Sequence, residues 1–161
     1  MCRFPDKTDA LVVVDVQRDF TSPDGSPDGS LYVPGGEQVV AVANLLSYAA
    51  EKKGVPMVFT HDGDSWADGL YVPTTAIVTS DGDDAVVQAL KAAGVERVVV
   101  VGLPTEYSVK GTVLALLAAD LRVTVIHEGI RAANLEPDDG KNARREMREH
   151  GAEIVRLLDA V

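Results

Sequence analysis

Short apolar runs alternate along the chain with segments in which apolar residues recur every three or four positions. The apolar runs, several of them rich in valine, predict strands over 10–15, 55–60, 76–79, 97–101, 121–126 and 152–155. The segments of helical spacing predict helices over 37–53, 83–93, 105–119 and 138–150. Strands that alternate with helices form parallel sheets covered on both faces. We therefore expect an α/β fold, a three-layer α/β/α sandwich with a doubly wound, mainly parallel sheet of about five or six strands.

Two polar segments interrupt this alternation. Residues 21–36 are rich in Pro, Gly, Ser and Asp, a composition that predicts a loop. Residues 61–73 mix Gly, Asp and aromatic residues and predict an irregular loop over the strand ends. The sequence contains no internal repeat and no interdomain linker, so residues 1–161 are expected to form a single domain.

The net charge of the chain limits the kinds of partner that it can bind. Its net charge of −10 repels phosphate backbones, so we expect no nucleic-acid partner. No apolar run approaches the roughly 18 residues of a membrane span, and the N-terminus lacks the apolar core of a signal peptide. A cytoplasmic location without membrane contact is expected. The single cysteine, Cys2, is consistent with a reducing compartment.

Residues 98–117, VVVVGLPTEYSVKGTVLALL, join a buried strand directly to a helix. Open α/β sheets place their chemistry at such carboxyl ends of strands. We expect Thr105 to cap the helix, and Ser108 falls in its first turn. A serine at this place still needs a base to take its proton, so Ser108 is either a nucleophile or an ordinary capping residue.

Asp15 closes the first valine-rich strand. A carboxylate at this position is partly desolvated, which raises its pKa toward the range of a general acid or base. The alternative is structural, because Asp15 could instead cap backbone amides or pair with an arginine such as Arg18. Its position in the sequence leaves both interpretations open.

Asp62, Asp64 and Asp68 lie in the acidic loop after the second strand. Carboxylate oxygens are the ligands that Mg²⁺ and Ca²⁺ prefer, so the three could gather around a cation. Their spacing is not that of a calcium loop, and an acidic loop in a protein this acidic is more often simply solvated.

Three motifs follow one another in the order of a known family. The first combines LVVVDVQRDF at 11–20 with GSLYVPGGEQVV at 29–40; the others are GVERVVVVGLPTEYSVKGTVLAL at 94–116 and IRAANLEPDDG at 130–140. Together they resemble the isochorismatase-like hydrolases, most of all their nicotinamidase branch. The resemblance implies an oligomeric α/β/α domain that hydrolyses small amides with an Asp, Lys and Cys triad, beside a divalent metal that helps to bind the substrate.

The resemblance assigns roles to residues of this chain. Asp15 matches the catalytic aspartate, and Ser108 occupies the place of the cysteine nucleophile. The substrate pocket would be lined by Phe20, Leu103, Pro104 and Tyr107.

Several positions differ from the family pattern, and each difference removes a group that the family uses. Where the triad lysine should follow the strand at 76–79, the chain offers Thr79, Ser80 or Asp81. Asp62 matches the metal-binding aspartate, but Asp64 stands where a histidine belongs. The stretch 64–83 is also shorter than is usual for the family, which removes the region of a second histidine and much of a lid.

Pro104 removes a further catalytic group. The family's oxyanion hole uses the amide of the nucleophile and the amide four residues earlier, which follows a cis peptide. We therefore predict a cis bond between Leu103 and Pro104, because proline tolerates it best. Proline has no N–H, so one oxyanion donor is lost, at a cost of roughly a hundredfold in rate.

Two functions remain open after these departures. The first is a degenerate amidase relative that serves as a small-molecule-binding or structural subunit, as a homo-oligomer or with an active paralogue. The second is a hydrolase of altered chemistry, in which Asp15 alone is the general acid or base, like the family's isochorismatases. No cofactor is expected, apart from a doubtful residual metal site. A space above Asp15 filled by Trp66, Tyr71 or Tyr107 would argue against any substrate.

Overall fold

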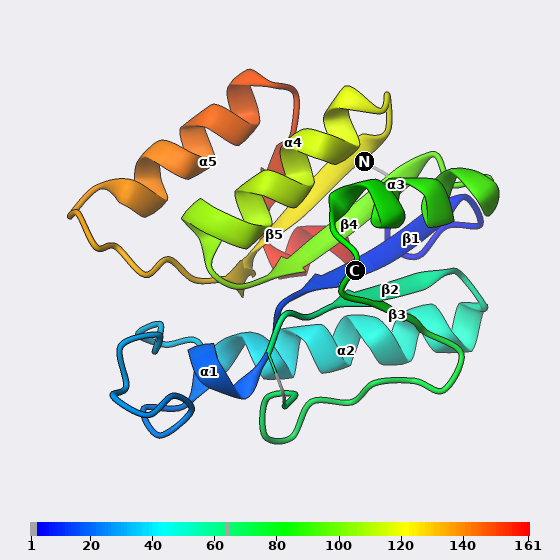
Figure 1. Ribbon diagram of the computed structural model, residues 1–161. Helices are drawn as coiled ribbons and strands as arrows, with labels where there is room; N and C mark the ends of the chain where they lie inside the picture. The colour runs from blue at the N-terminus through cyan, green and yellow to red at the C-terminus, as the bar shows by residue number, and fades with distance from the viewer. Residues whose placement is uncertain (1–2, 64) are drawn as a thin grey trace.

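The computed structural model describes residues 3–63 and 65–161. Within them, six strands form one parallel sheet in the order β3-β2-β1-β4-β5-β6 (Figure 1). The strands are β1 (Asp9–Val14), β2 (Met57–Thr60), β3 (Ile77–Thr79), β4 (Arg97–Gly102), β5 (Arg122–Ile130) and β6 (Glu153–Val155). The parallel sheet with helices beside it confirms the predicted α/β class.

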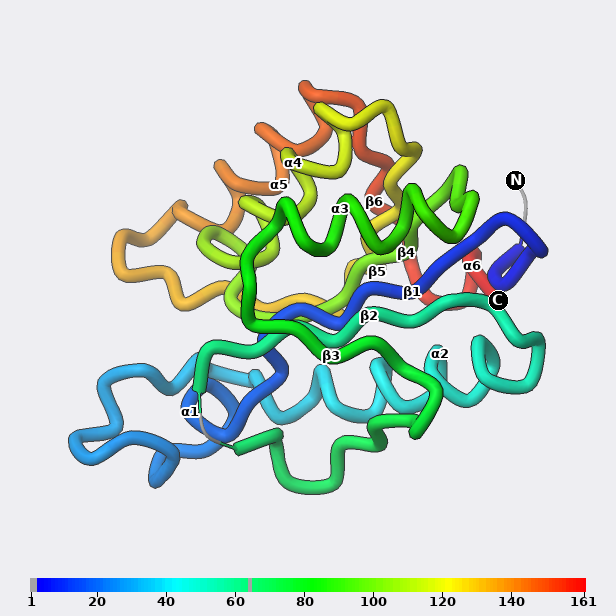
Figure 2. Tube along the Cα trace, turned by 45° about the vertical axis from the view of Figure 1, so that its right-hand side comes forward, coloured from blue at the N-terminus to red at the C-terminus, as the bar shows by residue number. Residues whose placement is uncertain are grey.

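Helices cover both faces of this sheet. They are α1 (Arg18–Thr21), α2 (Gln38–Lys53), α3 (Asp83–Ala92), α4 (Lys110–Ala118), α5 (Asp139–Glu149) and α6 (Leu157–Ala160), with a π-helical turn η1 (Thr105–Val109) before α4. Helices α3, α4 and α5 lie on one face and α2 on the other (Figures 1 and 2). None of the helices in the described ranges is long and apolar enough to cross a membrane.

The central strand β1 explains why its sequence is apolar without a break. Its residues alternate between the two faces of the sheet, and both faces are covered. Val13 packs in one buried cluster with Leu46 of α2, and Val12 packs in the other with Leu90 of α3. All six residues of β1 are buried, so the strand is fixed from both sides.

The order of the strands places the carboxyl ends of β1 and β4 side by side. The chain builds β2 and β3 on one side of β1 and then crosses over through α3 to β4 on the other. Such a switch in strand order opens a crevice at the carboxyl edge. Val14 faces Gly102 there, and Gly102 has a φ of 147°. A Cβ at Gly102 would lie 2.1 Å from the Val14 carbonyl oxygen, so the close approach requires glycine.

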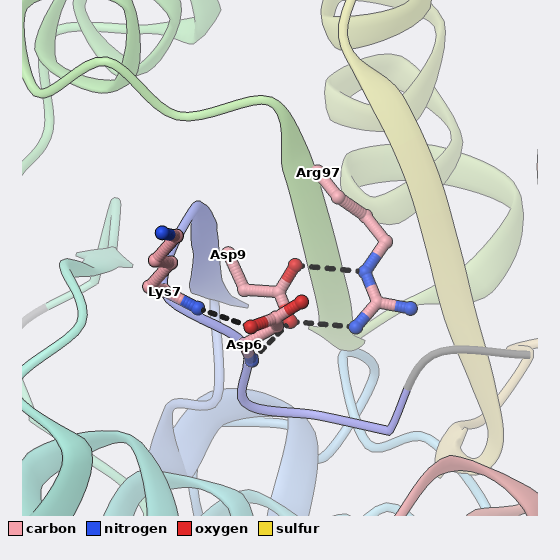
Figure 3. A network of polar contacts seen from close by, with 4 residues as sticks. All are labelled: Asp6, Lys7, Asp9 and Arg97. Carbon is pink, nitrogen blue, oxygen red and sulfur yellow. Dashed lines mark hydrogen bonds and ion pairs between the residues drawn. The ribbon is translucent and has the colours of Figure 1, made fainter.

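The opposite end of the same two strands is held by a buried ion pair (Figure 3). The guanidinium of Arg97 donates from Nε to Asp9 Oδ1 at 2.9 Å and from Nη2 to Asp9 Oδ2 at 2.6 Å. The Asp6 amide also donates to Asp9 Oδ2, at 2.7 Å. This two-point contact fixes the register of β1 against β4, and the sequence analysis did not predict it.

Some element boundaries differ from those predicted. The helix expected from 105 begins with the π-helical turn η1, and Pro104, not Thr105, stands before its first residue. Thr105 as a cap was wrong: its hydroxyl is buried and has no hydrogen-bond partner in the described part of the chain. The short helices α1 and α6 were not predicted, because four residues are too few for a periodic pattern.

Candidate functional site

A cavity of about 320 Å³ opens at the carboxyl ends of β1, β2 and β3. Its other wall is the segment from η1 into α4. Three aspartates line it, Asp15, Asp62 and Asp83. It therefore lies at the edge of the sheet where the strand order predicts a ligand site.

Asp15 is the first residue after β1, and its backbone turns sharply there. It has a φ of 49°, a left-handed conformation that asparagine and aspartate tolerate better than most residues. The residue is 8% exposed. The Thr60 hydroxyl donates to Asp15 Oδ1 at 2.8 Å, and Asp15 N–H donates to the Thr60 carbonyl at 3.1 Å. The last residue of β2 thus holds the carboxylate in place.

Burial raises the pKa of the Asp15 carboxyl above its ordinary value of 3.8. Hydrogen bonds from the Ser108 and Thr60 side chains oppose this rise, because they stabilise the charged form. The negative charges of Asp62 and Asp83 raise the pKa further. Arg18 does not neutralise Asp15, because its Nε lies 3.7 Å from Asp68 Oδ1 instead. The alternative in which Asp15 pairs with Arg18 was therefore wrong.

Two residues of η1, Tyr107 and Ser108, lie at the cavity. Ser108 lines it beside Asp15, while Tyr107 is half exposed at its edge. The Leu103–Pro104 peptide before η1 is cis, as predicted. The carbonyl of Pro104 accepts hydrogen bonds from the amides of Tyr107 and Val109, but Pro104 itself has no N–H to donate.

The cavity wall after β3, where the resemblance implies a lysine, is made of hydroxyl and carboxyl groups. Thr79, Ser80 and Asp83 line the cavity there, and Thr112 of α4 donates its hydroxyl to Asp83 Oδ1 at 2.7 Å. No lysine or arginine is found among the lining residues in the described ranges. The nearby Lys110 pairs instead with Glu146, at 3.2 Å.

The residues proposed for a metal do not come together in the part of the chain that the structure describes. Asp62 lines the cavity, whereas Asp68 is 84% exposed and pairs with Arg18. Asp64 lies outside the described residues. The described residues include no group of three or more His, Cys, Asp or Glu side chains that could hold a metal ion. The carboxylates described at 3–63 and 65–161 therefore do not form a donor set that fits a divalent metal, and we derive no chemistry from one.

Other predicted pocket residues lie outside the cavity lining. Leu103 is fully buried in the core cluster on the α2 side, and Phe20 packs against that cluster. Pro104 is also buried and does not line the cavity. These three side chains pack in or against the protein core. Of the four residues assigned to the substrate pocket, only Tyr107 therefore faces the cavity.

The space above Asp15 is open. Trp66 makes edge contacts with the rings of Phe59 and His61, and Tyr71 stacks on Tyr48. Neither Trp66 nor Tyr71 lines the cavity. Tyr107 does line the cavity but is half exposed, so these three aromatic side chains leave room for a ligand.

The sequence analysis missed Thr60, Asp83 and Thr112 as site residues. Thr60 ends a strand at the same edge as Asp15, which is a signal that the sequence carried. Asp83 and Thr112 belong to different helices, α3 and α4, and only the fold brings them together.

Comparison with known proteins identifies the family. The model of the isochorismatase domain matches residues 71–158, more than half of the chain. The chain belongs to the isochorismatase family. Nicotinamidase of Escherichia coli (strain K12) is 26% identical over 208 residues, covering 93% of this chain and 95% of that protein. This alignment is longer than the 161 residues of the chain, so dozens of its positions have no counterpart here.

Solved structures share the fold of this chain. Pyrazinamidase of Pyrococcus horikoshii in complex with zinc superposes with a TM-score of 0.77 at 24% identity, over 93% of this chain and 99% of that chain. MAR1 ribonuclease of Caenorhabditis elegans gives a TM-score of 0.73 at 20% identity, over 96% of this chain and 80% of that chain. Because their named activities differ, these likenesses establish the fold alone.

Proposed function

We propose that this member of the isochorismatase family does not hydrolyse amides and that it binds a small molecule in the Asp15 cavity. It would act as a binding or structural subunit, as a homo-oligomer or beside an active paralogue. The observation that carries the proposal is the charge of the cavity. Three aspartates line it, while lysine and arginine are absent from its lining within 3–63 and 65–161.

This charge opposes the chemistry of an acyl-enzyme. Amide hydrolysis by that route builds negative charge on the nucleophile as it loses its proton and then on the substrate oxygen. Neighbouring carboxylates disfavour both anions. Ser108 also lacks the low pKa of an activated thiol, and Pro104 supplies no oxyanion donor. Losing one such donor alone costs roughly a hundredfold or more in rate.

An activity assay tests the proposal directly. The purified protein is incubated with nicotinamide, pyrazinamide and a panel of small amides, and ammonia release is followed. Nicotinamidase of Escherichia coli, run in parallel, is the positive control. We expect no release above the buffer rate. Turnover that Asp15→Asn abolishes would show that the chain is an amidase and would overturn the proposal.

A second candidate function is favoured by Asp15 itself. A buried carboxyl with a raised pKa beside an open cavity is suited to general acid catalysis on an acid-labile ether bond. Isochorismate, a vinyl ether, is the substrate that tests it. Hydrolysis of isochorismate by the wild type but not by Asp15→Asn, without any amide hydrolysis, would favour this second function.

A further inference from the structure

A second cavity, of about 600 Å³, lies at the carboxyl end of β5, between the loop that follows it and α5. Arg131 of the loop and Arg144 of α5 line it, together with His127. It shares no lining residue with the Asp15 cavity among those described. The two cavities lie at the same edge of the sheet, and their lining charges are of opposite sign.

Arg131 is fixed in place by neutral acceptors. Its Nη1 donates to the carbonyls of Ile130 and Glu128, at 2.8 and 3.3 Å, and its Nη2 donates to Gln38 Oε1 at 2.9 Å. None of these acceptors carries a charge. The guanidinium is therefore held rigid without being neutralised, so little conformational entropy would be lost when it binds an anion.

Arg144 approaches the same cavity from the helix. It is half buried, and the described residues give it neither an ion pair nor a hydrogen bond. A Cβ at Gly140 would lie 3.5 Å from Arg144 Nη1 and 2.5 Å from Ala132 Cβ. Glycine at 140 thus lets the loop pack against the first turn of α5, which brings the two arginines to one cavity.

The walls between the two arginines are also fixed. Glu106 accepts hydrogen bonds from the amides of Ala133, at 2.9 Å, and Asn134, at 2.7 Å. Asn134 Oδ1 accepts a hydrogen bond from the Gly140 amide at 2.9 Å. The loop is therefore shaped before any ligand arrives.

One acidic residue, Glu128, also lines this cavity. Its Oε1 accepts a hydrogen bond from the Leu157 amide at 2.9 Å, which stabilises its charge independently of the arginines. Among the residues that line the cavity, two guanidinium groups face one carboxylate, which leaves a net positive lining in a protein whose overall charge is −10. The Glu106 carboxylate lies behind this lining, where the amides of Ala133 and Asn134 donate to it. A positive cavity in such a protein is not a consequence of its composition.

We propose that Arg131 and Arg144 form a second binding site, separate from the Asp15 cavity, for the oxyanion group of a small molecule. A guanidinium presents its N–H groups in a planar fork that matches the oxygens of a carboxylate or a phosphate. Two such forks from different elements can hold one group from two sides. Both kinds of oxyanion share this chemistry, and the experiment separates them.

The test is an NMR titration of the ¹⁵N-labelled protein at constant ionic strength, with inorganic phosphate and malonate added separately. We expect saturable shifts of the amides of residues 131–134 with at least one of the two anions. Arg144→Gln should weaken the affinity about tenfold, since it removes charge-assisted hydrogen bonds. The matched control is Arg145→Gln, the next residue of α5, which pairs with Glu149 and Asn142 and does not line the cavity. It should change the affinity less than twofold.

Arg131→Lys gives a second, independent check. It keeps the charge but loses the planar fork, and it too is expected to weaken binding. Shifts that rise linearly without saturation, or that decrease equally in Arg144→Gln and Arg145→Gln, would mean that anions only screen surface charge. Either result would overturn the proposal.

Discussion

Thr60 and Asp15 hold each other through a reciprocal pair of hydrogen bonds across the carboxyl edge of the sheet. The Thr60 hydroxyl donates to Asp15 Oδ1 at 2.8 Å and accepts from the Asp15 amide at 3.2 Å. The pairing of β1 with β2 positions the two residues, since Val14, the residue before Asp15, lies opposite Thr60 in the strand register. The carboxylate that the sequence analysis predicts to be catalytic is therefore oriented by the sheet itself.

Replacing Thr60 by valine should raise the pKa of Asp15 further. The hydroxyl stabilises the charged carboxylate, and valine keeps the shape but cannot donate. A ¹³C NMR titration of the Asp15 carboxyl in wild type and Thr60→Val measures the change. Thr75→Val, at an exposed position of the loop before β3, is the control and should leave the titration unchanged. A pKa that stays the same or falls in Thr60→Val would contradict the role given to this hydroxyl.

Stability should fall with rising pH because of Asp15. Below its ordinary pKa of 3.8, the carboxyl is protonated in both the folded and the unfolded protein and has no effect. As the pH rises between 3.8 and the raised folded value, the unfolded state releases this proton first, so unfolding becomes more favourable. Asp15→Asn removes this dependence. Its melting temperature, relative to wild type, should therefore increase from pH 3 toward pH 7.

Asp28 provides a control of opposite sign. Hydrogen bonds from Ser30 lower the pKa of this exposed carboxyl, so its contribution to stability is present at neutral pH and is lost as the pH falls. Asp28→Asn should therefore change the melting temperature slightly in the other direction. The role of burial at Asp15 would be disproved if the two variants responded to pH in the same sense.

The sequence predicted the alternation of strands and helices because residues buried on both faces, such as Val12 and Val13, leave a local pattern. It also predicted the cis bond before Pro104 through the family resemblance. Long-range pairs leave no such pattern. The contact between Asp83 and Thr112, like that between Asp9 and Arg97, depends on elements that only the finished fold brings together.

Packing decided which of the predicted pocket residues reach the cavity. Leu103 and Phe20 are apolar, and the sequence could not tell whether such residues would line a cavity or fill the core. Tyr107, the exposed residue of the turn η1, reaches the cavity edge. The opposite charges of the two cavities arise in the same way, because they depend on which loops meet at the edge of the sheet.

The ion pair between Asp9 and Arg97 should be costly to break from one side. Both side chains are at least nine-tenths buried, so Arg97→Met would leave the Asp9 carboxylate buried without its partner. We expect a loss of about 3–5 kcal/mol in the free energy of unfolding, measured by urea denaturation. Arg122→Met, at the exposed position that faces Arg97 on β5, is the control and should cost less than about 1 kcal/mol.

The double variant Asp9→Leu/Arg97→Met separates charge from packing. Replacing both partners by apolar residues removes the unpaired charge, so most of the lost stability should return. If the double variant is as unstable as Arg97→Met alone, the pair stabilises the fold by shape and not by compensating a buried charge.

A cysteine placed at 108 should be a poor nucleophile in this cavity. The N-terminal end of a helix offers about half a positive charge, whereas three aspartates line the cavity. The carboxylates therefore outweigh the helix, and the thiol of Ser108→Cys should have a pKa above the ordinary value of about 8.5. The measurement is the pH dependence of its alkylation by iodoacetamide, in a Cys2→Ser background that leaves no other thiol.

Adding Ser80→Lys brings an ammonium group to the exposed rim of the cavity and should lower the pKa of the thiol at 108 and speed its alkylation at neutral pH. A thiol at 108 that is already ionised at neutral pH without the added lysine would mean that the cavity still favours an anionic nucleophile, and the case against amide hydrolysis would lose its electrostatic basis.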